Sequence, residues 1–277
     1  MFNAMTRAEI WLQDTLDKSL GIEDLASHIG YSSSQVRRQF RQIFHISPSA
    51  YREIRRMERA AVLLALTPLN IAQIATHCGY QNHSSFSRAF QRRYQFSPRY
   101  FRLKLKSTFH HPAPPDGLNT RIEKTTGRQM ILMRRYKAPE RIQGLGDASY
   151  HNMQLACLQK RLRLSTTIIS LPDILADRIN ALNNDAFHSY RTDIGLYLSD
   201  TDNAQDVALP VHYRRVDIPT HYYASTCFES LADLYRALTH TIMHLLNRQD
   251  VWRVNGHPPQ VLWKANHLEL RIPLTDQ

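Results

Sequence analysis

The sequence is poor in cysteine, with only Cys78, Cys157 and Cys227 among 277 residues. They lie far apart and form no CxxC pair, which excludes the usual zinc-binding spacings and a disulfide framework. Sparse thiols of this kind are typical of proteins in a reducing cytosol. We expect each cysteine to be a small buried apolar residue.

Long apolar runs are also missing. The longest lies around residues 60–66, far short of the roughly 20 residues that cross a bilayer. Arg7, Glu9 and Asp14 interrupt the N-terminal stretch before a secretory leader of ordinary length can form. The sequence therefore predicts a soluble cytoplasmic protein that has no membrane partner.

Motifs of catalysis and cofactor binding are absent as well. We find no Gly-rich phosphate loop and no nucleophile signature, so we expect neither an enzyme nor a cofactor. His240 and His244 have the i, i+4 spacing of a metal pair on a helix, but no third ligand follows at a suitable spacing. No metal site is expected.

Acidic residues are scarce in the first part of the chain. Residues 1–110 contain 16 Lys and Arg against 7 Asp and Glu, a net charge of +9, whereas residues 111–277 have a net charge of +2. The first part is therefore suited to contact a polyanion, and double-stranded DNA is the leading candidate.

An internal repeat occupies this basic region. The segment Ala26-Ser-His-Ile-Gly-Tyr31 recurs 49 residues later as Ala75-Thr-His-Cys-Gly-Tyr80. The matches continue at a spacing of 50 residues, with Arg38, Phe40, Ser47, Pro48 and Arg52 paired with Arg88, Phe90, Ser97, Pro98 and Arg102. One inserted residue in a turn explains the change of spacing.

Each copy predicts a short helix, a sharp turn at Gly30 or Gly79, and a second helix at 33–44 or 83–94. Residues 49–66 predict one long helix that separates the two copies by about 27 Å, close to one turn of DNA. Arg and Gln side chains pair with base edges in the major groove, and arginines farther along a helix suit phosphates. The predicted DNA-binding residues are Ser34, Gln35, Arg37, Arg38, Arg41, His83, Ser84, Ser85, Ser87, Arg88 and Arg92.

The tandem arrangement resembles the DNA-binding domain of the AraC/XylS family of bacterial regulators over residues 6–106. The resemblance is carried by the Ala-x-x-x-Gly-Tyr core and the Ser-Pro close of each copy. It implies a single chain, monomeric on DNA, that binds an asymmetric site and activates transcription by also contacting RNA polymerase. Its base-reading positions map to Ser34, Arg37 and Arg38, and to His83, Ser84, Ser85, Ser87 and Arg88. Relatives of the multidrug-resistance branch often have Trp where this chain has Ser34, so the target sequence is left open.

Three prolines and a glycine at residues 110–117 predict a linker at 109–119 between domains at 1–108 and 120–277. Beyond it, strands are expected at 121–126, 130–136, 193–198, 213–218, 222–227 and 268–272, and helices at 147–162 and 231–248. The fold class is thus an all-α tandem helix-turn-helix domain followed by an α+β domain with pseudo-symmetric strand-strand-helix-strand repeats.

This domain order resembles the Rob-like members of the family, whose C-terminal part is similar to GyrI-like domains that bind amphipathic or cationic small molecules. The resemblance implies an effector site, for which the candidates are Tyr222, Tyr223, Phe228, Trp252, Gln260 and Trp263. Relatives often place a buried Glu near the Pro258-Pro259 stretch, but here Gln260 or Val261 stands there, which disfavours a strongly cationic ligand. Two alternatives stay open: a degenerate domain that serves protein interaction or stability, and a GyrI-like hydrolase.

Overall fold

The computed structural model describes residues 2–109, 117–135, 167–170, 174–175, 192–197, 213–218, 220–247, 253–264 and 266–275. Contacts between Cα atoms divide the chain into two compact units, Met1–Lys104 and Leu105–Gln277, here named unit 1 and unit 2. Most of the predicted linker lies outside the described residues.

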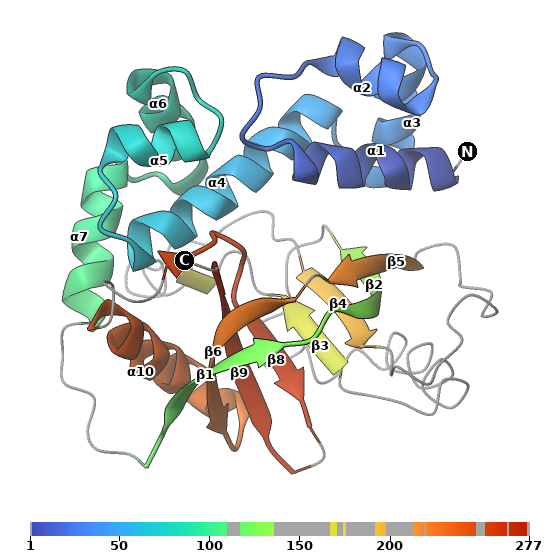
Figure 1. The fold of residues 1–277 in the computed structure, drawn as a ribbon. Helices are drawn as coiled ribbons and strands as arrows, with labels where there is room; N and C mark the ends of the chain where they lie inside the picture. Colours follow the sequence, from blue (N-terminus) through green and yellow to red (C-terminus); the bar gives the residue numbers. More distant parts are fainter. Residues whose placement is uncertain are drawn as a thin grey trace. The chain divides into compact units, whose positions relative to one another are not determined.

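Unit 1 consists of helices and their connecting turns. The helices are α1 (Phe2–Asp14), α2 (Ile22–Ile29), α3 (Ser33–Phe44), α4 (Pro48–Leu66), α5 (Ile71–His77), α6 (His83–Tyr94) and α7 (Pro98–Phe109), which continues into unit 2. Figure 1 shows α4 as a long diagonal helix, with α2 and α3 toward one end and α5 and α6 toward the other. We name α2–α3 the first half and α5–α6 the second half.

The two glycines of the repeat have the backbone conformation that the sequence predicted. Gly30 has a φ of +77° and Gly79 a φ of +72°, values in the left-handed region that favours glycine. The bounds of α3 and α6 agree with the predicted helices, and α4 begins one residue earlier than expected, at Pro48. Ser47 caps α4, because its Oγ accepts a hydrogen bond from the Ala50 amide at 3.2 Å.

Each half is fixed to the long helices by a cluster of buried aromatic rings. In the first half, the ring centroid of Phe40 lies 4.4 Å from that of Phe44 and 5.6 Å from that of Tyr51. In the second half, Phe90 contacts three rings, those of Phe86, Tyr94 and Phe101, at 5.9, 4.8 and 5.1 Å. Burial of these apolar faces leaves the opposite faces of α3 and α6 to the solvent.

The described residues of unit 2 form an antiparallel sheet. Its strands are β1 (Thr120–Thr125), β2 (Arg128–Arg135), β3 (Thr167–Ser170), β4 (Thr192–Tyr197), β5 (Tyr213–Ile218), β6 (His221–Phe228), β7 (Arg253–Val254), β8 (Gln260–Trp263) and β9 (Leu268–Thr275). Their order is β1-β6-β9-β8-β3-β4-β2-β5, and β7 pairs with β9 outside this path. The strands form four equivalent pairs: β1 with β5, β2 with β6, β3 with β8, and β4 with β9. If the two members of every pair are exchanged, the strand order read from the opposite edge of the sheet is the same. The sheet therefore has the two-fold pseudo-symmetry that the sequence suggested.

The repeat contains more strands than expected. β3, β7 and β8 were not predicted, and the second repeat runs β5, β6, α10, β7, β8, β9 rather than strand-strand-helix-strand. The three missed strands have four, two and four residues, which is too short for a clear alternation of apolar and polar residues. The expected helix at 147–162 lies outside the described residues.

The helix α10 (Leu234–Leu246), which follows a short 3-10 turn, η3 (Leu231–Asp233), packs on one face of the sheet against β1, β6 and β9. Buried hydroxyls join this helix to the strands, because Thr226 Oγ1 lies 2.6 Å from Thr241 Oγ1 and 2.7 Å from Thr120 Oγ1. Thr120 Oγ1 also lies 2.9 Å from Nδ1 of His240. His240, one of the two histidines with the spacing of a metal pair, therefore takes part in this hydrogen-bonded network.

The cysteines differ from the prediction in part. Cys78 is fully buried, and burial raises the pKa of its thiol to about 12, so it is a neutral apolar residue as expected. Cys227 is exposed, because it lies near the end of β6 on the face of the sheet opposite α10, and the expectation of burial was wrong there. Cys157 lies outside the described residues.

Candidate nucleic-acid interface

The first candidate reading helix, α3, begins at a capping box. Ser32 Oγ accepts a hydrogen bond from the Gln35 amide at 3.3 Å, and Gln35 Oε1 accepts one from the Ser32 amide at 3.0 Å. This reciprocal pair satisfies backbone donors that the first turn otherwise leaves free. Gln35, predicted to contact DNA, is exposed and also serves as a cap through its side-chain oxygen.

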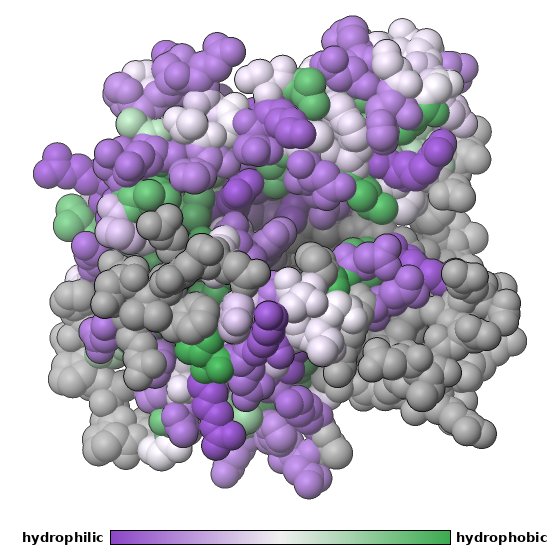
Figure 2. All heavy atoms as spheres, viewed as in Figure 1, coloured by the Kyte–Doolittle hydropathy of each residue, from purple (hydrophilic) through white to green (hydrophobic). Residues whose placement is uncertain are grey.

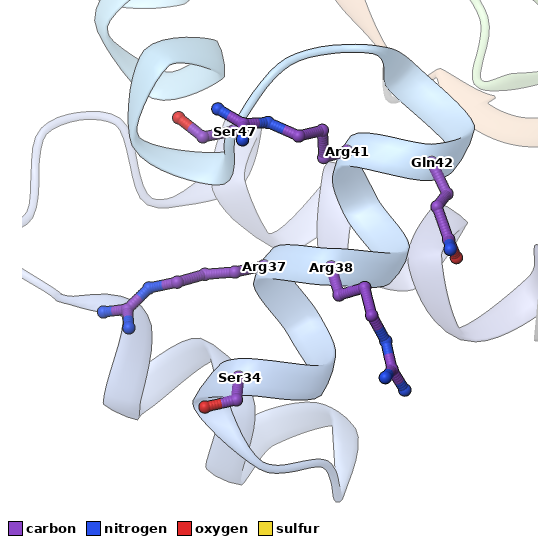
Figure 3. Close-up of a pocket in the computed structure, with 6 residues that line it drawn as sticks. All are labelled: Ser34, Arg37, Arg38, Arg41, Gln42 and Ser47. Carbon is purple, nitrogen blue, oxygen red and sulfur yellow. The ribbon is translucent and has the colours of Figure 1, made fainter.

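An open groove of about 670 Å³ lies along consecutive turns of α3. It is lined by Ser34, Arg37, Arg38, Arg41, Gln42 and Ser47. Figure 3 shows these side chains extending outward from successive turns of α3, with Ser47 at the start of the next helix. Ser34 and the three arginines are exposed, as predicted. The groove combines three cationic side chains with short hydroxyls and one amide, a set of donors and acceptors that suits phosphates and base edges.

The second candidate reading helix, α6, is capped by Asn82, whose Oδ1 accepts a hydrogen bond from the Ser85 amide at 2.8 Å. His83, Ser84 and Arg88 are exposed, while Ser85 and Ser87 are partly buried. Arg88 Nη2 lies 3.5 Å from Ser85 Oγ, which holds the guanidinium close to the start of the helix.

Two of the predicted arginines have acidic neighbours. Arg92 Nη2 lies 2.7 Å from Glu53 Oε1 on α4, and this hydrogen bond raises the pKa of Arg92 above its ordinary value. Arg37 Nη2 lies 3.9 Å from Glu23 Oε1, with both side chains largely exposed. Exposed pairs of this kind contribute little to stability, so both arginines can exchange their partner for a phosphate.

The structure thus places all eleven predicted DNA-binding residues on α3 and α6, five on the first helix and six on the second. It adds Gln42 and Ser47 at the edge of the groove. Gln42 follows Arg38 by four residues, so helical spacing was a signal that could have identified it. Hydrophilic side chains dominate the visible face of unit 1 in Figure 2.

The predicted effector residues do not share one surface. Strand register pairs Trp263 and Phe228 with the same residue, Leu268, so both lie on the face of the sheet that α10 covers, together with Tyr222. Tyr223 and Gln260 lie on the opposite face, because side chains alternate along a strand. Trp252 lies outside the described residues.

The face that carries Tyr223 and Gln260 also contains a buried carboxylate that sequence reasoning missed. Glu269 is 1% exposed; it accepts hydrogen bonds from Ser225 Oγ at 2.8 Å and Arg271 Nε at 2.7 Å, and it pairs with Lys264. Burial raises the pKa of Glu269, but Arg271, Lys264 and Ser225 outweigh this effect and hold the pKa below its usual value. The carboxylate is thus charged and already neutralised by two cations of the chain.

Among the described residues, no cluster of three or more His, Cys, Asp or Glu is placed to hold a metal ion. Within the same residues, every helix is too short or too polar to cross a membrane.

Comparison with known proteins finds a family match within unit 1. A family model described as a helix-turn-helix domain matches residues 25–104. The regulatory protein SoxS of Escherichia coli is 35% identical over 95 residues, which are 34% of this chain and 89% of SoxS. The transcriptional regulator Rob of Salmonella typhimurium is 32% identical over 106 residues, 38% of this chain and 37% of Rob.

A solved transcriptional regulator from Chromobacterium violaceum, described as having an AraC-type DNA-binding domain, is 28% identical. The likeness covers 40% of this chain and 95% of that chain, with a TM-score of 0.36. The chain spans less than half the length of Rob and of YkgA, an Escherichia coli protein described as a putative regulator of the helix-turn-helix type.

Proposed function

This chain belongs to the AraC/XylS family of helix-turn-helix regulators, and we propose that it binds double-stranded DNA in a sequence-specific way to regulate transcription. The observation that carries the proposal is the pair of capped helices, α3 and α6, each with Arg and Ser side chains exposed. They belong to a unit in which residues 1–104 contain 15 Lys and Arg against 7 Asp and Glu, a net charge of +8. A helix of this kind fits the major groove, and the net charge adds attraction to phosphates.

The binding site on DNA is asymmetric in this proposal, since the two reading helices carry different side chains. α3 contributes Arg37, Arg38 and Arg41, whereas α6 contributes mainly His83 and serines around Arg88. The helix between them, α4, has 19 residues and a length of about 28 Å. That length suits two successive major grooves on one side of the duplex, so a single chain supplies both contacts.

The test begins with selection of duplexes from a random DNA pool by the full-length protein. Arg38→Ala and Arg88→Ala are each expected to weaken binding to the enriched duplex by about 1–3 kcal/mol, because each removes a cation that is positioned for the groove. Arg7→Ala, which removes an exposed arginine from α1, is the matched control and should bind as the wild type does. The proposal fails if no duplex is enriched, or if Arg38→Ala and Arg88→Ala both bind as tightly as Arg7→Ala.

The direction of regulation proposed is activation, through a further contact with RNA polymerase, as the family resemblance implies. Transcription by purified bacterial RNA polymerase from a template that carries the enriched site tests this directly. A rise in transcript with added protein supports activation, while a fall identifies a repressor. No chemical step is required of the protein in either case.

For unit 2 we propose an amphipathic or aromatic effector on the sheet face that carries Tyr223 and Gln260. Tyr223 supplies a ring there, and Gln260 supplies an uncharged amide. Glu269 on the same face is neutralised by Arg271 and Lys264, and Glu123, which pairs with Tyr223 in the register, accepts a hydrogen bond from the Tyr223 hydroxyl at 3.0 Å. Both carboxylates therefore have partners within the chain, which disfavours a cationic ligand. Thermal unfolding of the full chain with panels of neutral and cationic aromatic compounds tests this, because a ligand that binds the native state raises the unfolding temperature. If no compound raises the unfolding temperature, the result favours the alternative that unit 2 is a degenerate domain that serves protein interaction or stability.

A further inference from the structure

A single arginine of α4 lies at the contact between the two halves of unit 1. Arg56 donates hydrogen bonds from Nε to the carbonyl oxygen of Leu16 at 2.7 Å and from Nη2 to that of Lys18 at 2.9 Å. Both carbonyls belong to the connection that leads into the first half. One planar guanidinium thus fixes two backbone groups of that connection in a definite orientation.

The other side of the same guanidinium contacts the second half. The Cζ atom of Arg56 lies 5.5 Å from the ring centroid of Tyr80, in the turn between α5 and α6. Tyr80 is partly buried, and burial raises the pKa of its hydroxyl to about 12, so the ring is neutral beside the cation. The contact is a cation–π interaction that links α4 to the turn before the second reading helix.

Gly79 brings the backbone of this turn close to the first half. A Cβ atom built on Gly79 would collide with the Leu16 carbonyl oxygen and lie 2.5 Å from Arg56 Nη2, closer than real Cβ atoms approach. Gly30, the equivalent residue of the first half, has nothing within 4 Å of such an atom although its φ is nearly the same. Close approach of the backbone is therefore required at Gly79 and not at Gly30.

A second link lies beside these residues, where Glu53 of α4 pairs with Arg92 of α6 at 2.7 Å. A small cavity of about 240 Å³ between the halves is lined by Glu53, Arg56 and Tyr80 among others. The cavity shows that the halves are not packed tightly at every point. We therefore use the name junction only for the residues in direct contact: Leu16, Lys18, Arg56, Gly79 and Tyr80.

We propose that this junction is a positioning device that fixes the distance and rotation between the two reading helices, with Arg56 as its central positioning residue. The inference rests on the proposed function, since it concerns how α3 and α6 engage one duplex together. A rigid pair of helices fits a single separation of half-sites. One added base pair moves the second half-site by about 3.4 Å and rotates it by about 35°, which a rigid pair cannot follow.

Loosening the junction has two expected consequences for binding. Affinity at the preferred separation falls, because the second helix is no longer pre-organised to reach its groove once the first has bound. Discrimination against other separations falls as well, since the freed helix can follow a displaced half-site. A change that only lowered stability or removed a DNA contact would weaken binding at every separation by the same factor.

The experiment uses the full-length protein and the duplex enriched from a random pool, with one base pair added or removed between the half-sites. The wild type is expected to lose at least about tenfold in affinity at either altered separation, comparable to the loss of one good base contact. Arg56→Ala and Gly79→Ala are expected to lose no more than about threefold relative to their own binding at the preferred separation. Gly30→Ala is the matched control and should retain the wild-type ratio, since its Cβ meets nothing.

Arg56→Lys guards against a failure of Arg56→Ala to fold, because it keeps the charge but loses the planar fork that holds two carbonyls. The inference is overturned if Arg56→Lys and Gly79→Ala keep the wild-type ratio of affinity at the preferred separation to affinity at an altered separation. It is also overturned if the wild type binds all separations equally well. Failure of the wild type to enrich any duplex would instead refute the proposed function itself. A duplex with the first half-site alone completes the design, because the variants should bind it as the wild type does.

Discussion

The first half of unit 1 exposes Arg37, Arg38, Arg41 and Gln42 on α3, whereas the matching positions of α6 are Ser87, Arg88, Gln91 and Arg92. Only one arginine is common to both faces at these positions. Beneath them, the scaffold is nearly the same: the helix lengths agree, both turns contain a glycine with positive φ, and both helices bury aromatic rings. The repeat therefore retains what determines the fold and varies what contacts the ligand.

The largest expected difference between the halves concerns their cores. Phe40→Ala and Phe90→Ala should each lower the free energy of unfolding of unit 1 by about 3–5 kcal/mol, because each removes a fully buried ring. Phe90→Ala should cost more, since Phe90 contacts three rings and Phe40 two. Denaturant unfolding followed by circular dichroism measures both. Equal or reversed effects would mean that ring contacts do not distinguish the cores.

The turn glycines give the next test of the comparison. Gly30→Ala should destabilise unit 1 by about 1 kcal/mol, the cost of placing a side chain in the left-handed region. Gly79→Ala should cost about 3 kcal/mol, because the same penalty is joined by a clash with the Leu16 carbonyl and with Arg56. The same unfolding measurement applies, and similar losses for the two variants would contradict the close contact at Gly79.

Exchange of one side chain between the reading faces tests whether their difference matters for DNA. Arg37→Ser gives α3 the residue that α6 has at the matching position, and it should weaken binding by about 1–2 kcal/mol. If Arg37 contacts a phosphate, the slope of log affinity against log salt concentration should also fall by about one. Titration of the enriched duplex at several salt concentrations provides both values. Unchanged affinity would place Arg37 outside the interface.

The smallest expected effect concerns the helix caps. Asn82→Ala should cost about 1 kcal/mol, since it removes a hydrogen bond of 2.8 Å to the Ser85 amide. Ser32→Ala should cost about half as much, because its bond to the Gln35 amide is 3.3 Å long and Gln35 still accepts a hydrogen bond from the Ser32 amide. Thermal unfolding resolves the order, and a greater loss for Ser32→Ala would show that the capping box is the stronger cap.

Local signals in the sequence predicted unit 1 well because its helices are defined locally. Gly30 and Phe40 lie beside or within α3, so the helix and its exposed face could be inferred together. The junction at Arg56 could not be inferred, because Leu16 and Gly79 are 63 residues apart and the repeat makes Gly79 look equivalent to Gly30. Whether Gly30 or Gly79 lies against another part of the backbone depends on the angle between the two halves, which the sequence repeat does not determine.

Unit 2 was less predictable for a related physical reason. The buried Glu269 has Arg271 and Lys264 two and five residues away in the sequence, but its third partner, Ser225, lies 44 residues earlier on β6. The predicted effector residues lie on two faces of the sheet, with Tyr222, Phe228 and Trp263 on one face and Tyr223 and Gln260 on the other. Strand register determines which face each residue occupies, and register cannot be read from the residue types alone.

The pairing of β1 with β6, and of β6 with β9, determines when unit 2 can fold during synthesis. All residues of unit 1 have left the ribosome once Lys104 has, whereas the sheet lacks the interior strand β9 until residue 275 has been made. At about 5–20 residues per second, translation of the intervening 171 residues takes roughly 10–30 s. Throughout that interval the basic unit 1 can fold, while β6 and β8 still lack β9, the strand with which both pair.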